Sequence, residues 1–424
     1  MRKRESVAMI LASGYEAGLG ALGHCLEKPT LFYGGAHRII DFTLSNCIHS
    51  EMDAIGILPQ RLSAELHSYI GDGQAWTLAK EDGGVFVLPA KKGKDYTDTA
   101  DAVYKNIDFI ERFGPDYVCV FRSDHVCKMD YAKILDVHKR NGADATIVST
   151  SPWKTSRYGM LHVDEEGKVL GFEVDPQRRG MNLASMGIYI FNWDTLRRRL
   201  ATGNLSAEWG DTLAKNVLSA MLAEGEKVCS YRFEEYWRDL GTVESLWESN
   251  MDLLRDPPLF TIQEEGKEVF NSSGVQSVRV VKAPKIEQSI LTGLHDIRGR
   301  VEHSILSDSV VVEEGAEIVD SVLMPNVYVG KNTKIHKAVV APNTKFMDNV
   351  EIGVTDGAAA FVCEHICARG VSAIASWVYV GAETKLRGNS NIEKEAFIYG
   401  SYFHVLNPER ISGVSSLPSF EFAT

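Results

Sequence analysis

The chain has 424 residues, of which 44% are hydrophobic and 24% are charged, and its formal net charge is −12. This length exceeds that of one ordinary domain and predicts two, while the composition is that of a soluble globular protein. The acidic balance argues against sequence-independent binding to nucleic acid or to an anionic membrane, because both partners require a basic protein face.

The cysteines and the N-terminus bear on where the protein works. No apolar segment is long enough to span a bilayer, and the short apolar run after Met1–Glu5 is typical of a strand rather than of a signal peptide. The 7 cysteines are scattered and odd in number, which favours a reducing compartment. The sequence therefore predicts a cytoplasmic protein.

Strand-like and helix-like stretches alternate over residues 1–255. Continuous apolar runs occur at Ser6–Ala12, Ala54–Leu58 and Tyr117–Phe121. This alternation predicts an α/β domain with a mostly parallel sheet covered on both faces. Ligands bind such sheets at the carboxyl ends of the strands, so Ser13-Gly14 and Ser123–His125 are expected at the mouth of one cleft.

A change of pattern follows a predicted linker over residues 256–290, which contains Pro257-Pro258. Over residues 291–424 apolar residues recur at a spacing of six, as in Ile305 and Val311, Val312 and Ile318, Val329 and Ile335, Val380 and Leu386, and Ile392 and Ile398. This period is typical of a left-handed parallel β-helix, and chance spacing in an ordinary antiparallel sheet is the alternative. Such domains usually organise oligomers.

An ordered set of motifs carries a family resemblance over residues 6–400. Tyr33–Cys47 reads YGGAHRIIDFTLSNC, close to FGGKYRIIDFPLSNC of ADP-glucose pyrophosphorylases. Further matches in the same order are Lys28-Pro29, Thr99–Val103, Leu183–Phe191 and Tyr236–Thr242. The chain thus resembles this family, which implies a nucleotidyltransferase-type, Rossmann-like domain followed by the β-helix.

The resemblance implies a reaction and a metal. Family members join ATP and glucose-1-phosphate into ADP-glucose and release pyrophosphate, an in-line displacement that depends on positioning and on neutralising charge. Asp124 and Asp239 match the two aspartates that hold the divalent metal, which implies Mg²⁺ here if nucleotide binding persists. The alternative is that each aspartate only caps a helix or a turn.

The resemblance also implies positions that contact the substrate and the nucleotide. Ordinary turn and cleft roles are the alternative for several of them. The implied positions are Leu11, Ala12, Gly14, Lys28, Gln60, Thr99, Tyr158, Gly159 and Ser185.

The phosphate-handling residues depart from the family pattern. Glu16 stands where the phosphate loop has a glycine, and Gly18 stands where it has the catalytic arginine. Asp175 replaces the lysine that binds the sugar phosphate. A carboxylate near phosphate repels it, and loss of a cation removes stabilisation of the leaving group. The alternative is that the loop is misaligned by a residue or two, with Arg38, the family-like residue at the regulatory site, or another cation compensating.

The leading hypothesis is therefore a catalytically impaired member of the family. It would be a regulatory or structural partner of an active paralogue in a tetramer that makes ADP-glucose for glycogen, and a homo-oligomer is also possible. One alternative is an active glucose-1-phosphate adenylyltransferase. Another is a stand-alone sensor that binds a sugar phosphate or a nucleotide sugar.

Overall fold

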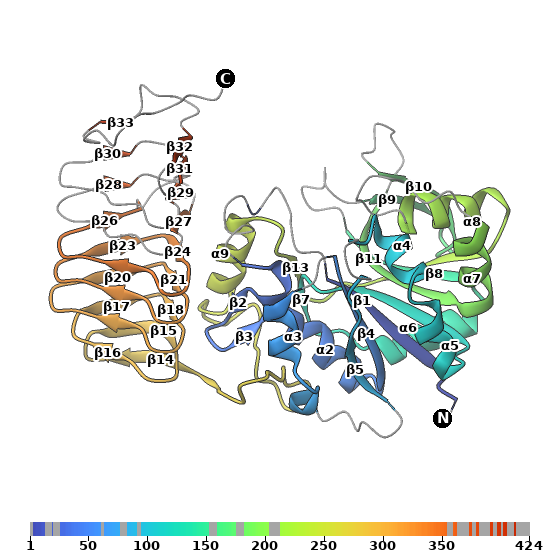
Figure 1. Cartoon of the computed structure of the whole chain (residues 1–424), viewed down its shortest axis with the longest axis horizontal. Coiled ribbons are helices and arrows are strands. Elements are labelled where there is room, and N and C mark those ends of the chain that lie inside the picture. Colours follow the sequence, from blue (N-terminus) through green and yellow to red (C-terminus); the bar gives the residue numbers. More distant parts are fainter. Residues whose placement is uncertain are drawn as a thin grey trace.

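The computed structural model describes most of the chain, in segments. They are residues 3–12, 19, 26–60, 63–76, 83–90, 95–151, 159–174, 182–202, 213–353 and 359–362, and then 373–374, 379–380, 391–392, 397–399, 402–404 and 411–412. Figure 1 shows an N-terminal α/β domain beside a stack of short strands, so the two-part organisation predicted from the sequence is present.

In the described segments, nine strands form the sheet of the N-terminal domain. They are β1 (Ser6–Ala12), β4 (Ala54–Pro59), β5 (Gly84–Val87), β6 (Tyr117–Arg122), β8 (Ala145–Thr150), β9 (Gly159–Val163), β10 (Val169–Val174), β11 (Leu183–Asn192) and β12 (Val228–Arg232). The order is β10-β9-β11-β6-β1-β4-β5, and β8 pairs with both β11 and β12. β1 lies parallel to β4 and β6, which confirms the parallel core, whereas β11 runs antiparallel to β6, β8 and β9.

Helices cover both faces of this sheet. Alternation along β1 places Met9 in one buried cluster, with α4, α5 and α7, and Ile10 in the other, with α2, α3 and α6. None of the helices in the described segments is long and apolar enough to cross a membrane. The α-helices are α2 (Ile39–His49), α3 (Ala64–Ile70), α4 (Thr99–Tyr104), α5 (Ile107–Phe113), α6 (Tyr131–Asn141), α7 (Trp193–Thr202), α8 (Ser219–Ala223) and α9 (Val243–Asp252).

The C-terminal part is a parallel β-helix with three faces, as the six-residue spacing predicts. One face contains β17 (Arg300–Glu302), β20 (Glu317–Val319), β23 (Lys334–His336), β26 (Glu351–Ile352), β28 (Ala373–Ile374) and β30 (Asn391–Ile392). The second contains β18 (Ile305–Leu306), β21 (Val322–Leu323), β24 (Ala338–Val340), β27 (Ala360–Val362), β29 (Tyr379–Val380) and β31 (Phe397–Tyr399). The third contains β16 (Asp296–Ile297), β19 (Val311–Val312), β22 (Tyr328–Val329) and β25 (Lys345–Phe346).

Between Arg300 and Ile352 each coil of the β-helix advances the chain by 17 residues, so that Ser321 follows Ser304 in the stack, whereas the step from Ile290 to Ile305 is 15 residues and that from Ala338 to Ala360 is 22. The inward side chains follow steps of six, six and five, and all are fully buried: Leu306, Val312, Ile318, Leu323, Val329, Ile335, Val340, Phe346 and Ile352. Val311, one of the residues in the predicted six-residue pairs, is only half-buried, because its neighbour Val312 takes the inward position. The repeat thus has one shortened side per coil.

The corners of the β-helix require left-handed backbone. Asn326 and Asn343 occupy one corner column with φ of 62° and 60°, and Asn332 and Asn349 occupy another with φ of 53° and 60°. Asparagine tolerates this conformation better than most residues, because its short polar side chain can form local hydrogen bonds. The polar residues between apolar pairs therefore set the turns.

The ends of the β-helix carry antiparallel strands. β14 (Ser277–Ala283) pairs with β15 (Ile286–Thr292), which is shared by the first two faces. Both strands begin inside the segment predicted as a linker, because the hairpin closes the first coil. The domain limits at 255 and 291 themselves stay predictions. At the other end β32 (Tyr402–His404) and β33 (Ile411–Ser412) pair antiparallel with β31 and β30.

Helix α9 joins the two parts of the molecule (Figure 1). Trp247 Nε1 donates to the carbonyl of Asp320 at 2.6 Å, and Lys337 Nζ lies 4.6 Å from the Trp247 ring centroid. Glu244 Oε2 accepts the backbone N–H of Ala359 at 2.9 Å. One buried apolar cluster also runs across the junction from Tyr33 to residues of the second β-helix face. The β-helix is therefore packed against the α/β domain.

Candidate functional site

The carboxyl ends of β1, β4 and β6 meet at one edge of the sheet, as the sequence predicts. Leu11 and Ala12 close β1, and their carbonyls accept the N–H groups of Ser123, at 3.1 Å, and of Gln60, at 3.2 Å. These bonds bring three predicted contact residues and the segment before Asp124 to the same edge.

A buried lysine lies at the centre of this edge. Lys28 begins a 3-10 turn, Lys28–Thr30, in which Pro29 fixes the local backbone. Its side chain is 0% exposed, and Nζ lies 2.5 Å from Asp124 Oδ2 and 3.7 Å from Asp239 Oδ1. Asp239 reaches the site because β13 (Trp237–Asp239) pairs with β7 (His125–Cys127), which places Asp239 opposite His125. The two predicted metal aspartates and Lys28 therefore lie together.

An arginine that we did not single out in the sequence completes the cluster. Arg122 Nε donates to Asp124 Oδ1 at 3.0 Å, and Nη2 donates to Oδ2 at 2.6 Å. The sequence does contain a signal for Arg122, because residues two apart in extended backbone project to the same side. Arg122 closes β6 directly before Ser123-Asp124, so this spacing brings its side chain to the carboxylate. We call Lys28, Arg122, Asp124 and Asp239 the charged cluster.

Burial and charge oppose each other at Asp124. Burial alone would raise the pKa of this carboxyl, but the neighbouring Arg122 and Lys28 cations hold it well below its usual range. Burial lowers the pKa of His125 to about 4, despite the nearby carboxylates, so its imidazole is neutral at pH 7. The cluster thus combines two ionised cations with an ionised Asp124.

The carboxylate oxygens of Asp124 and Asp239 show whether the cluster, as arranged, could bind a divalent metal ion. Asp239 Oδ1 is buried without a hydrogen-bond partner in the described structure, which suits a metal ligand. Both oxygens of Asp124, however, already contact Arg122 or Lys28. No group of three or more His, Cys, Asp or Glu in the described segments could hold a metal ion. As arranged, the pair does not fit a divalent ion bound by both aspartates, and the metal-ligand role stays a prediction.

Two of the predicted contact residues have structural partners. Thr99 opens α4, and its hydroxyl accepts the N–H of Leu213 at 3.2 Å. Asp98 is the N-cap of the same helix, and its side chain accepts the N–H of Asp101 at 2.7 Å. Ser185 Oγ accepts the N–H of Gly187 at 3.1 Å inside a β-bulge of β11.

Gly159 opens β9, and its lack of a side chain has a packing reason. A Cβ there would lie 2.3 Å from Cζ of Phe172 on the neighbouring strand β10. Glycine at this position therefore leaves room for the Phe172 ring. The ligand contacts predicted for Gly159, Thr99 and Ser185 stay predictions.

Arg38 lies at the N-terminus of α2 with its side chain 16% exposed. Its guanidinium lies 3.6 Å from the Phe32 ring centroid, forms a 3.0 Å ion pair with Glu65 and donates to the carbonyl of Thr30. Thr30 belongs to the turn that carries Lys28, so Arg38 supports that turn. Its predicted regulatory role would have to compete with these contacts.

Five residues of the predicted site lie outside the described part of the chain. They are Gly14, Glu16, Gly18, Tyr158 and Asp175. The predicted loss of phosphate contacts at Glu16, Gly18 and Asp175 therefore rests on the sequence.

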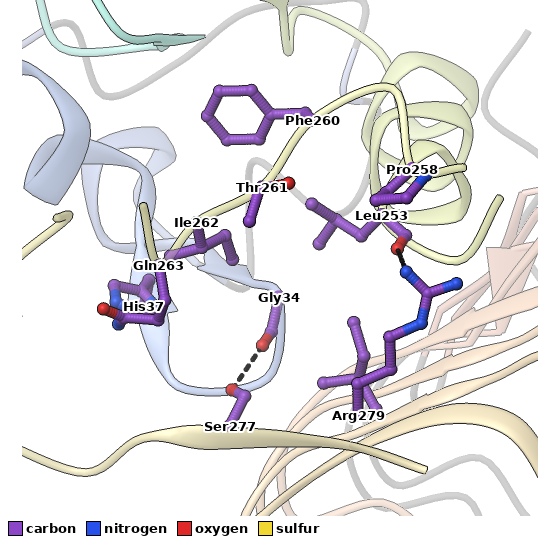
Figure 2. A pocket seen from close by; sticks show the side chains of 11 residues that line it. Gly34, His37, Leu253, Pro258, Phe260, Thr261, Ile262, Gln263, Ser277 and Arg279 are labelled. Atoms are coloured by element: carbon purple, nitrogen blue, oxygen red, sulfur yellow. Dashed lines mark hydrogen bonds between the residues drawn. The ribbon is translucent and has the colours of Figure 1, made fainter. Parts of the chain in front are cut away.

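A cleft lies at the domain junction, away from the charged cluster, with about 530 Å³ of space that is partly open to solvent. Figure 2 shows Phe260, Ile262 and Leu253 around it, with Arg279 at one side. The Arg279 guanidinium donates to the carbonyls of Leu253, Leu254 and Arg255 at 2.8–3.3 Å. Burial lowers the pKa of His37, also on this cleft, to about 4. The lining is thus mainly apolar, with its arginine committed to backbone carbonyls.

Comparisons with known proteins agree with this geometry. Residues 7–256 match the model of the nucleotidyl transferase family, and residues 282–374 match the model described as GlmU-like, C-terminal hexapeptide. Glucose-1-phosphate adenylyltransferase of Acetivibrio thermocellus is 37% identical over 421 residues, which cover 98% of either chain. The protein of the same name from Bacillus cytotoxicus is 43% identical over 355 residues, 82% of this chain and 94% of the relative. The chain therefore belongs to the ADP-glucose pyrophosphorylase, or glucose-1-phosphate adenylyltransferase, family.

Proposed function

We propose that the edge formed by β1, β4 and β6 binds ATP and glucose-1-phosphate, and that the chain transfers the adenylyl group to give ADP-glucose and pyrophosphate. The relatives that match 82–98% of the chain carry the name of this activity, which favours it over an inactive role. The observation that supports it most directly is the buried Lys28, held between Asp124 and Asp239.

The residues of the cluster suggest how they would act. Negative charge develops on the phosphate oxygens as the bond to the leaving pyrophosphate breaks, and fixed cations in a buried site stabilise that charge. Lys28 and Arg122 are the two cations of the described structure at this position, and Asp124 fixes both of them within 3.0 Å. Nucleotidyltransferases generally use a divalent metal such as Mg²⁺, which the nucleotide would bring with its phosphates.

A second function is favoured by the same cluster. Asp124 is already neutralised by Arg122 and Lys28, and the sequence lacks family cations at Gly18 and Asp175. This combination supports a catalytically impaired subunit that regulates or holds together an active paralogue, as a tetramer in the cytoplasm. The tetramer and the active paralogue are both part of this proposal.

The deciding experiment measures pyrophosphate release from ATP, glucose-1-phosphate and Mg²⁺ by the purified chain alone. Turnover that is lost in Lys28→Gln supports the adenylyltransferase. Lys139→Gln, at a half-buried lysine with carboxylate partners that lies outside the charged cluster, is the control and should keep full turnover.

The absence of turnover in the folded wild-type chain would contradict the leading proposal. The same assay with an intact paralogue then separates the remaining functions. A changed rate or effector response of the paralogue supports the partner subunit. No change, together with saturable binding of glucose-1-phosphate or ADP-glucose, supports the sensor.

A further inference from the structure

The charged cluster contains two carboxyl side chains and two basic side chains, so acidic and basic groups face each other in equal number without an additional ion. Arg122 binds Asp124 through two nitrogens, at 3.0 and 2.6 Å, which is the bidentate geometry of a strong guanidinium–carboxylate pair. Lys28 lies on the other side, 2.5 Å from Asp124 and 3.7 Å from Asp239. The cations therefore occupy the space beside Asp124 in which a divalent ion would bind it.

The fold is adapted to the arginine. Gly187 has φ of +67°, and a Cβ at this position would lie 2.5 Å from Cδ of Arg122. A side chain at residue 187 would thus push the guanidinium away from Asp124. The Arg122 backbone is fixed as well, because its carbonyl accepts the hydroxyl of Thr43 at 2.9 Å and its strand register places it opposite Leu11.

We infer that Arg122 is a resident cation that takes the place of a protein-bound divalent metal at Asp124. A metal ion that used Asp124 would have to displace a bidentate guanidinium and would also meet the charge of Lys28. The cluster therefore binds free divalent ions weakly, and Arg122 is a positioning and charge-neutralising residue for phosphate at this edge. Only that last assignment, to phosphate, rests on the proposed function.

The test is a titration of the full chain with Mn²⁺ alone, with free Mn²⁺ measured by electron paramagnetic resonance. Arg122→Ala should bind Mn²⁺ at least about tenfold more tightly than the wild type, because one repelling charge is gone and Asp124 Oδ1 is released, while Oδ2 keeps its contact with Lys28. Arg122→Lys keeps the charge and should stay close to wild type. Arg300→Ala, at an exposed arginine of the β-helix, is the matched control.

Equal Mn²⁺ affinity of the wild type and a folded Arg122→Ala would overturn the inference. A second measurement uses only the wild type, so the inference can still be tested if the variant does not fold. Crystals soaked in Mn²⁺ should show no anomalous peak between Asp124 and Asp239, whereas a peak within coordination distance of both contradicts the inference. Neither readout involves turnover, so failure of the proposed adenylyl transfer would appear separately.

Discussion

The β-helix and the charged cluster differ in whether their structural features are repeated along the chain. In the β-helix an inward apolar residue and a left-handed corner recur with each coil, as Val312, Val329 and Phe346 show on the third face. The cluster is assembled once, from Lys28 in a short turn, Arg122 at a strand end and Asp239 far along the chain. A residue that is substituted in one coil has equivalents in the neighbouring coils. A residue of the charged cluster has no such equivalent in the described structure.

The largest effect is expected from a cavity in the β-helix. Phe346→Ala removes a fully buried ring from the third face and should lower the free energy of unfolding by about 4 kcal/mol. Because coils contact mainly their neighbours, the loss should appear as an early thermal transition of the C-terminal part. Leu294→Ala, at a side chain 83% exposed, should leave the melting curve unchanged. A single, cooperative shift of the whole curve would contradict the repeat-like behaviour.

The next effect concerns the cluster. Lys28→Met leaves Asp124 and Asp239 without the buried ammonium and should cost about 3 kcal/mol in urea unfolding. The exposed pair of Lys3 and Asp116 is the control, and Lys3→Met should cost less than about 0.5 kcal/mol. Similar costs for the two variants would show that the buried position of Lys28 carries no special weight.

A pH effect should appear near the junction cleft. The pKa of His37 is about 4 in the folded chain because the imidazole is buried, and it is 6.5 for an ordinary histidine. Between these values the unfolded chain binds the extra proton, so His37 lowers stability as the pH falls from about 6.5 towards 4. His37→Gln should remove roughly 2 kcal/mol of this pH dependence, measured by urea unfolding at pH 7 and pH 4.5. Parallel pH profiles of variant and wild type would show that His37 does not titrate in this way.

The smallest effect is expected at a corner of the β-helix, where two variants separate the contribution of the backbone conformation from that of the side-chain hydrogen bond. Asn326 has φ of 62° and donates to Asn343 Oδ1 at 3.0 Å. Asn326→Ala should cost about 1 kcal/mol because alanine is strained in left-handed backbone. Asn326→Gly loses the same hydrogen bond but accepts the backbone, so it should unfold close to wild type. Equal losses in the two variants would assign the effect to the hydrogen bond instead.

The same contrast explains what the sequence could predict. The β-helix could be predicted because the spacing of apolar residues corresponds directly to the residues that are buried. The inward positions that follow from this spacing are Val312, Ile318, Val329 and Ile335. The six-residue pairs alone could not show that one side of each coil between Arg300 and Ile352 has five residues, because the five-residue steps, such as Ile318 to Leu323, fall between the pairs. The meeting of β1 and β6 at one sheet edge followed from the general rule for parallel strands.

The composition of the cluster was only partly predictable. Family motifs pointed to Lys28, Asp124 and Asp239, because each stands inside a matching segment. Arg122 carries no motif, and its role depends on the space beside Gly187, whose positive φ arises from a bulge in β11. This bulge depends on how β11 pairs with its neighbouring strands, so it could not be predicted from the local sequence pattern.

Asp239 and helix α9 belong to one short, continuous piece of chain. Asp239 ends β13, Thr242 is the N-cap of α9, and Trp247 of that helix is bonded to the β-helix. This piece therefore spans the distance between the charged cluster and the domain junction. At one end Asp239 lies 3.7 Å from Lys28, and at the other the Trp247 indole is bonded to the Asp320 carbonyl, so a single run of chain contributes to both places.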